Sequence, residues 1–98
     1  MQILISGRHI DIGSHEKEVI EEKLGKFEKK LPGLTKTEVI VKMESSKVNL
    51  EAILHIAHSN PIVASASSDS ILGSLDLTMS KLDKMVKKIS DKVHDHHR

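Results

Sequence analysis

Residues 37–56 read TEVIVKMESSKVNLEAILHI, and this stretch decides the fold. Apolar and polar residues alternate on both sides of the polar segment ESSK at 44–47. Alternation with a period of two is typical of a strand with one buried face, and a short polar interruption is typical of a hairpin turn. The stretch therefore predicts two paired strands, with only Ile40 and Ile53 placing apolar side chains on the exposed face. The residues expected on the buried face are Thr37, Val39, Val41, Met43, Val48, Leu50, Ala52, Leu54 and Ile56.

Two further strands are expected on either side of this hairpin. A short run rich in β-branched residues predicts a first strand at about residues 2–7, ending at Ser6-Gly7. The segment at 57–61 contains Asn-Pro, which disfavours helix, so it is expected to be a turn. Alternation of alanine and serine after it predicts a fourth, weaker strand from Ile62 to about Ser67.

Two helices are predicted from apolar residues spaced three and four apart. The first spans about Ser14 to Leu31, with Ser14 as its N-cap and Pro32-Gly33 as its stop. The second spans about Ser70 to Val93 or beyond, with Asp69 or Ser70 as its cap. The apolar stripes consist of Ile20, Leu24, Phe27 and Leu31 in the first helix and of Ile71, Leu75, Met79, Leu82, Val86, Ile89 and Val93 in the second.

The order β-α-β-β-β-α predicts an α+β fold with two layers. Each helix has one apolar stripe and the strands have one apolar face, so both helices are expected to pack on the same face of a four-stranded sheet. The first two strands, joined through a helix, should run parallel. The other face of the sheet should remain in contact with water. With 98 residues the chain is expected to be one domain.

Composition excludes several classes of function. The chain has no Cys, which excludes disulfides, thiolate metal sites and a catalytic thiol. It has one Phe and neither Trp nor Tyr, so recognition of single-stranded bases by aromatic stacking is excluded. No apolar run approaches the ~20 residues needed to span a bilayer, and the N-terminus lacks the pattern of a signal peptide. We therefore expect a cytoplasmic protein that does not bind membranes.

Lysines form one row on each predicted helix, although the net charge is only +1. On a helical wheel each row lies on one flank of the apolar stripe, whereas Asp76 and Asp83 lie on the opposite flank of the last helix. Two such rows on adjacent helices predict a cationic groove that suits a phosphate backbone. The alternative is that both flanks are merely solvated, because acidic residues early and basic residues late in a helix also suit its dipole. The rows are Lys23, Lys26 and Lys30 on the first helix and Lys81, Lys84, Lys88 and Lys92 on the last, while Lys29 and Lys87 lie off both flanks.

Catalysis and cofactor binding find no support in the motifs. The chain has no glycine-rich phosphate loop, no His-Glu-x-x-His and no nucleophile elbow. His94, His96 and His97 invite a metal hypothesis, since neutral imidazole binds zinc, copper and nickel. They crowd the end of the chain, where residues 94–98 are expected to form a frayed tail, so adventitious binding is the favoured interpretation. We therefore expect no enzyme activity, cofactor, metal site or small-molecule substrate.

Several segments resemble one family in their order and spacing. They are MQILISGRHI at 1–10, EKLGKFEK at 22–29, VIVKME at 39–44, EAILHI at 51–56 and LD at 75–76 followed by KLDKM at 81–85. Together they resemble the ribosome hibernation promoting factors, also called ribosome-associated inhibitor or sigma-54 modulation proteins, over essentially the whole chain. The sequence departs from that pattern at Leu72, Ser80 and Lys84, where the family usually has Tyr, Asp and Arg.

The resemblance implies that residues 1–98 form one ribosome-binding domain. It implies binding to ribosomal RNA of the small ribosomal subunit near the decoding centre, where messenger and transfer RNA would lie, and hence inhibition of translation in stationary phase. A separate small ribosome modulation factor would be a further partner. A competing hypothesis is a small protein-interaction module that uses the open sheet face and binds no RNA. By position the resemblance assigns RNA contacts to Lys23, Lys26, Lys81, Lys84 and Lys88, and the wheel adds Lys30 and Lys92.

Overall fold

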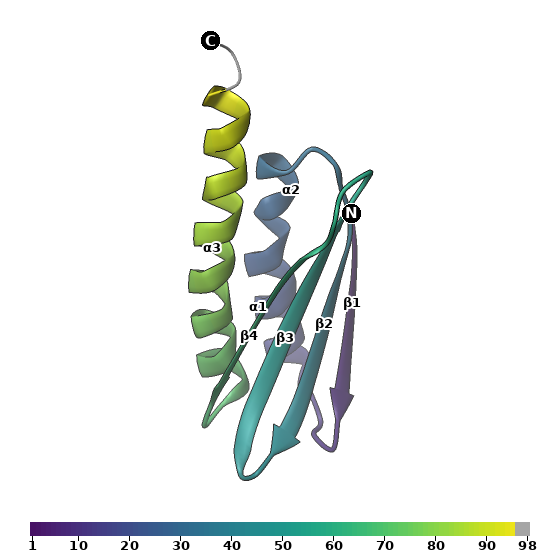
Figure 1. Ribbon diagram of the computed structural model, residues 1–98. Coiled ribbons are helices and arrows are strands. Elements are labelled where there is room, and N and C mark those ends of the chain that lie inside the picture. The colour runs from purple at the N-terminus through teal and green to yellow at the C-terminus, as the bar shows by residue number, and fades with distance from the viewer. Residues whose placement is uncertain (96–98) are drawn as a thin grey trace.

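The computed structural model describes the backbone of residues 1–95 and the side chains of residues 1–89. Within these residues, four strands and three helices follow one another in the predicted order, with the first predicted helix divided into two (Figure 1). The elements are β1 (Gln2–Arg8), α1 (Ser14–Gly25), α2 (Phe27–Lys30), β2 (Leu34–Glu44), β3 (Lys47–Ile56), β4 (Ile62–Ser68) and α3 (Ile71–Asp95).

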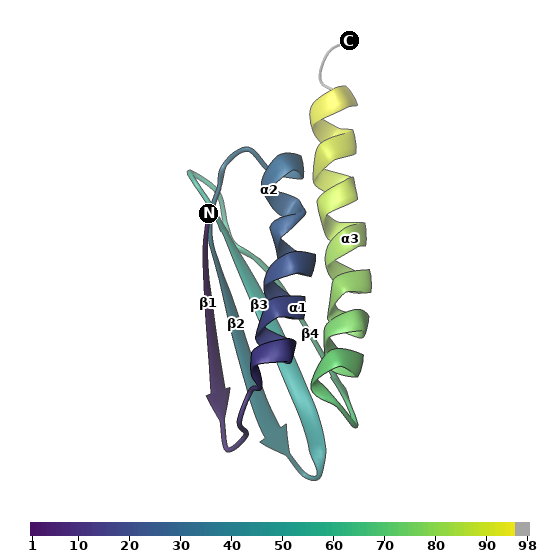
Figure 2. The ribbon, with the colours of Figure 1, turned by 180° about the vertical axis from the view of Figure 1, so that it is seen from behind.

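The four strands form one sheet in the order β1-β2-β3-β4. β1 runs parallel to β2, whereas β2, β3 and β4 pair antiparallel. The helices cover one face, with α3 beside α1 and α2, and the opposite face carries no helix (Figures 1 and 2). The predicted two-layer α+β fold and the parallel first pair are therefore confirmed.

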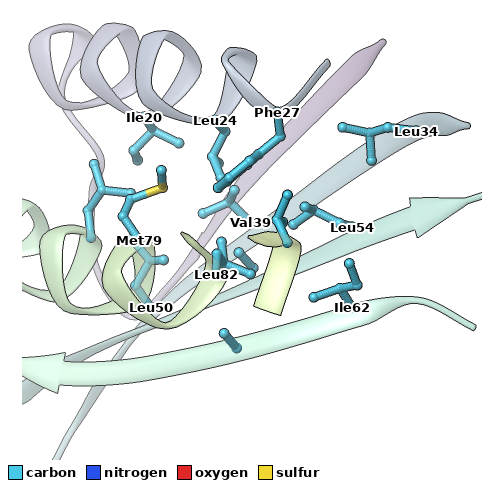
Figure 3. Close-up of a cluster of buried hydrophobic side chains, with 14 of the residues drawn as sticks. Ile20, Leu24, Phe27, Leu34, Val39, Leu50, Leu54, Ile62, Met79 and Leu82 are labelled. Carbon is cyan, nitrogen blue, oxygen red and sulfur yellow. The ribbon is translucent and has the colours of Figure 1, made fainter. Parts of the chain in front are cut away.

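A single core cluster lies between the helical layer and the sheet (Figure 3). Leu24 and Phe27 belong to the first helical segment, which consists of α1 and α2 (residues 14–30). They and Leu82 of α3 point toward Val39 and Leu54 of the central strands. All five side chains are buried, as the alternation in the strands and the stripes of the helices predicted. Burial of such apolar surface is the main favourable contribution to folding.

The predicted core is wrong at the ends of the elements. Met43 was expected on the buried face but is 42% exposed, because it lies next to the hairpin turn, where β2 reaches past the helices. Ile89 continues the stripe of α3 and is 37% exposed, since α3 extends beyond the end of α2 (Figure 1). Periodicity identifies the inward side of an element but not the point at which its neighbour ends.

The helix boundaries differ slightly from the prediction. The first helix is interrupted at Lys26, whose backbone remains in the right-handed helical region, so α2 continues in the direction of α1. Ser14 is the first helical residue and Gly13 takes the cap position without a side-chain hydrogen bond. Ser70 caps α3 as predicted, because its Oγ accepts a hydrogen bond from the amide of Gly73 at 2.9 Å. Asp69 instead pairs with Lys47 at 2.7 Å, and that hydrogen bond and charge lower the pKa of the Asp69 carboxyl.

Two buried hydroxyl groups of α3 contact β3. The Oγ atom of Ser74 donates a hydrogen bond to the carbonyl of Val48 at 2.6 Å. The Oγ1 atom of Thr78 shares its one proton between the carbonyl of Ser74 in α3, at 2.8 Å, and that of Leu50 in β3, at 3.3 Å. Both side chains are fully buried, and buried hydroxyls are costly unless they are hydrogen-bonded. Together with the buried apolar stripe, these contacts hold one side of α3 against the sheet, so the charged flanks point away from it.

Within the described part of the chain, no helix combines the length and the apolar character needed to cross a membrane.

The turn between β2 and β3 provides a test of the hairpin. Glu44 pairs with Lys47, so the loop has two residues, and both Ser45 (φ 49°) and Ser46 (φ 67°) lie in the left-handed region. Two-residue turns of this kind favour glycine at the second position. We expect Ser46→Gly to raise the free energy of unfolding by about 1 kcal/mol and the midpoint of thermal unfolding by about 4–8 °C. The same change at Ser67, inside β4, should lower both, and a destabilised Ser46→Gly protein would contradict the turn geometry.

Candidate functional site

Lys23 of α1 and Lys26, which follows α1, face the acidic flank of α3. The Lys23 Nζ atom donates a hydrogen bond to Oδ1 of Asp76 at 3.2 Å. The Lys26 Nζ atom lies 3.0 Å from Oδ1 of Asp83 and 5.5 Å from the centre of the Phe27 ring. Two ion pairs therefore connect the helices along the seam between them.

The second lysine row lies on the other flank of α3, beside β4. Lys81 and Lys84 line an open hollow of about 490 Å³ with Val63, Ala64, Ser65 and Met85. The Lys81 Nζ atom donates a hydrogen bond to the carbonyl of Ser65 in β4 at 2.6 Å. The prediction that both rows border one groove is therefore wrong. Since the apolar stripe of α3 faces the sheet, its two flanks point to opposite sides, and only the acidic flank faces α1.

A separate hollow of about 420 Å³ lies between the first helical segment and α3. Lys26 and Lys30 line it from one side, and Asp83, Val86 and Lys87 line it from α3. Lys87 was predicted to lie away from both rows, yet among the described lysines of α3 it is the one that shares a hollow with Lys26 and Lys30. Residues four apart lie on the same flank of a helix, so the sequence alone could have placed Lys87 beside Asp83.

The predicted lysines thus fall into distinct environments. Lys23 and Lys26 are ion-paired, Lys30 lines the hollow between the helices, and Lys81 is bound to β4. Lys84 and Lys88 are exposed, with no ion-pair partner among residues 1–89. The side chains of Lys92, His94, His96 and His97 and the predicted frayed tail at 94–98 lie outside the described residues. In the part that is described, no group of three or more potential ligands is arranged to hold a metal.

The open face of the sheet carries no lysine row but a mixture of apolar and charged side chains among the described residues. Leu4 of β1 and Val63 of β4 are 44% and 43% exposed there. Ile53 stands between them in the cross-strand row, next to Glu38, whose Oε1 atom lies 2.6 Å from Nε2 of His55. This face mixes apolar side chains with both signs of charge, whereas the helical layer carries the lysine rows.

Comparison with known proteins places this arrangement among ribosome-associated factors. The ribosome hibernation promoting factor of Azotobacter vinelandii is 32% identical over 92 residues, which cover 94% of this chain and 85% of that protein. The factor of the same name from Escherichia coli strain K12 is 27% identical over 96 residues, covering 98% of this chain and all of that protein.

Two solved structures have the same fold as this chain. A ribosomal subunit interface protein from Coxiella burnetii superposes with a TM-score of 0.81 at 25% identity, covering 93% of this chain and 99% of that one. The N-terminal domain of Protein Y from Thermus thermophilus superposes with a TM-score of 0.75 at 18% identity, over 89% and 94% of the two chains. The sequence also matches one family description over residues 3–94. This chain therefore belongs to the sigma 54 modulation protein / S30EA ribosomal protein family.

Proposed function

We propose that the protein is a ribosome hibernation factor, a non-catalytic protein that binds the small ribosomal subunit and inhibits translation. It would occupy the region near the decoding centre where messenger and transfer RNA lie, with residues 1–98 acting as one ribosome-binding domain in the cytoplasm. A small ribosome modulation factor would be a second partner. Membership of the family supports ribosome association and agrees with the expectation that the protein is not an enzyme. The RNA contacts are assigned to Lys23, Lys26, Lys30, Lys81, Lys84, Lys88 and Lys92.

One observation carries the assignment to the helical layer. Both described lysine rows lie on this layer, whereas the acidic residues beside them, Asp76 and Asp83, are already paired with Lys23 and Lys26. Lys30, Lys84 and Lys88 therefore add positive charge that the seam does not neutralise. A lysine-lined surface without exposed aromatic residues suits a phosphate backbone, because ammonium groups release the counterions of the polyanion.

The proposal is tested by sedimenting the protein with purified small ribosomal subunits at low and at moderate salt. We expect the protein to sediment with the subunits and the bound fraction to fall as salt rises, since phosphate contacts are weakened by salt. Purified large subunits serve as the control for unspecific attraction to RNA. If the protein remains in the supernatant with small subunits at both salts, the ribosome-binding function is wrong. Binding to a cellular protein through the open sheet face would then become the better hypothesis.

A further inference from the structure

The two carboxylates of the seam stand among the lysines that the proposed function assigns to RNA. Asp76 and Asp83 are 67% and 44% exposed, and their partners Lys23 and Lys26 are 45% and 44% exposed. Ion pairs with this much exposure contribute little to the free energy of unfolding, so the lysine of each pair can exchange its carboxylate for another anion. All four side chains are partly exposed on the helical layer, the surface that the proposed function assigns to RNA.

Asp83 is the more informative of the two. Its Oδ1 atom is shielded from solvent and accepts no hydrogen bond among the described residues, although the Lys26 ammonium lies 3.0 Å away. The contact between them is therefore Coulombic and lacks the alignment of a hydrogen bond. Asp83 also stands in the hollow lined by Lys26, Lys30 and Lys87, so among residues 1–89 it is the one anion beside three cations there.

We propose that Asp76 and Asp83 are internal counter-ions that hold Lys23 and Lys26 in the free protein and give up these lysines to RNA phosphates on binding. The inference rests on the proposed function. The carboxylates connect α1 to α3 and prevent repulsion among the lysines while the site is empty. In the complex they oppose the incoming phosphates, so they lower the affinity and the number of counterions released. Asp76 and Asp83 are thus positioning residues that set how tightly RNA binds.

The test compares the affinity of purified small ribosomal subunits for the wild type and for Asp83→Asn, between about 50 and 200 mM salt. Each Asp→Asn change should tighten binding about two- to fivefold. The slope of log affinity against log salt should become steeper, by up to about one for each lysine released. Glu21→Gln is the matched control, because it makes the same change in net charge on an exposed residue of α1 that has no ion-pair partner among residues 1–89. Asp83→Glu, which keeps the charge, should retain the wild-type slope.

A second background separates this role from a general change in charge. If Asp83 acts through Lys26, then Asp83→Asn should lose most of its effect when Lys26 is already alanine. Undiminished tightening in the Lys26→Ala background would overturn the inference, as would equal behaviour of Asp83→Asn and Glu21→Gln. Failure of the wild type to bind small subunits would instead reject the proposed function. Thermal unfolding of every variant shows whether the seam is also needed for the fold.

Discussion

Truncating Leu82 to alanine is expected to lower the free energy of unfolding by about 2–5 kcal/mol. Leu82 is completely buried at the centre of α3 and points into the core between α3 and the sheet (Figure 3). The truncation removes apolar contacts and leaves a cavity, which the closely packed neighbours of the same core, such as Phe27 and Leu54, can fill only in part. Because a domain of this size is stable by only about 5–15 kcal/mol, the change removes a large part of the total. Chemical denaturation followed by circular dichroism measures it.

Leu77 provides the matched control for this prediction. It is the same residue type in the same helix, but its side chain is 50% exposed. Leu77→Ala should change the free energy of unfolding by no more than about 0.5 kcal/mol, the usual size of a surface substitution. If the two variants lost similar stability, the orientation of α3 described above would be wrong.

Most of the fold could be predicted from the sequence because each element reports its buried side locally. The alternation around Val39 and Leu50 and the stripe through Leu82 need no knowledge of distant residues. The exposure of residues near the ends of elements could not be predicted, because it depends on how far the neighbouring elements extend. Met43 follows the alternation and is nevertheless exposed, because no helix reaches the end of the hairpin. The interruption of the first helix at Lys26 also leaves no mark in the apolar spacing, since the backbone there stays helical.

The site was less predictable for a related reason. A helical wheel assigns Lys84 to one flank of α3 and Asp83 to the other, but it cannot state which neighbour each flank faces. That choice depends on how α3 packs on the sheet and beside α1, through contacts between residues far apart in the chain, such as that of Ser74 with Val48. A single groove between two lysine rows was therefore expected, whereas the structure places an ion-paired seam between them. Lys87, which the wheel placed off both rows, lines the hollow between the helices together with Lys26 and Lys30.

Replacing Lys84 and Lys88 together by alanine is expected to weaken binding to small ribosomal subunits about 10- to 100-fold at ~0.1 M salt. Both side chains are exposed; Lys84 lines the hollow beside β4, and Lys88 lies one turn further along the same flank of α3. If each contacts one phosphate, the slope of log affinity against log salt should shrink by roughly two. The fold should be unaffected, because neither residue belongs to the core cluster. Titration of labelled protein with subunits at several salt concentrations measures both quantities.

The control for this prediction removes the same charge elsewhere. Lys17 and Lys29 are exposed on the first helical segment, and neither has an ion-pair partner among residues 1–89 or lines the hollow between the helices. If the Lys17→Ala/Lys29→Ala protein lost as much affinity as the Lys84→Ala/Lys88→Ala protein, the attraction would depend on net charge alone and the lysine row of α3 would have no particular role. A selective loss at Lys84 and Lys88 requires phosphates to approach α3 from the β4 side. If Lys23 and Lys26 of the seam also contact phosphates, RNA would have to pass over α3, and a single groove between the helices would not account for the binding.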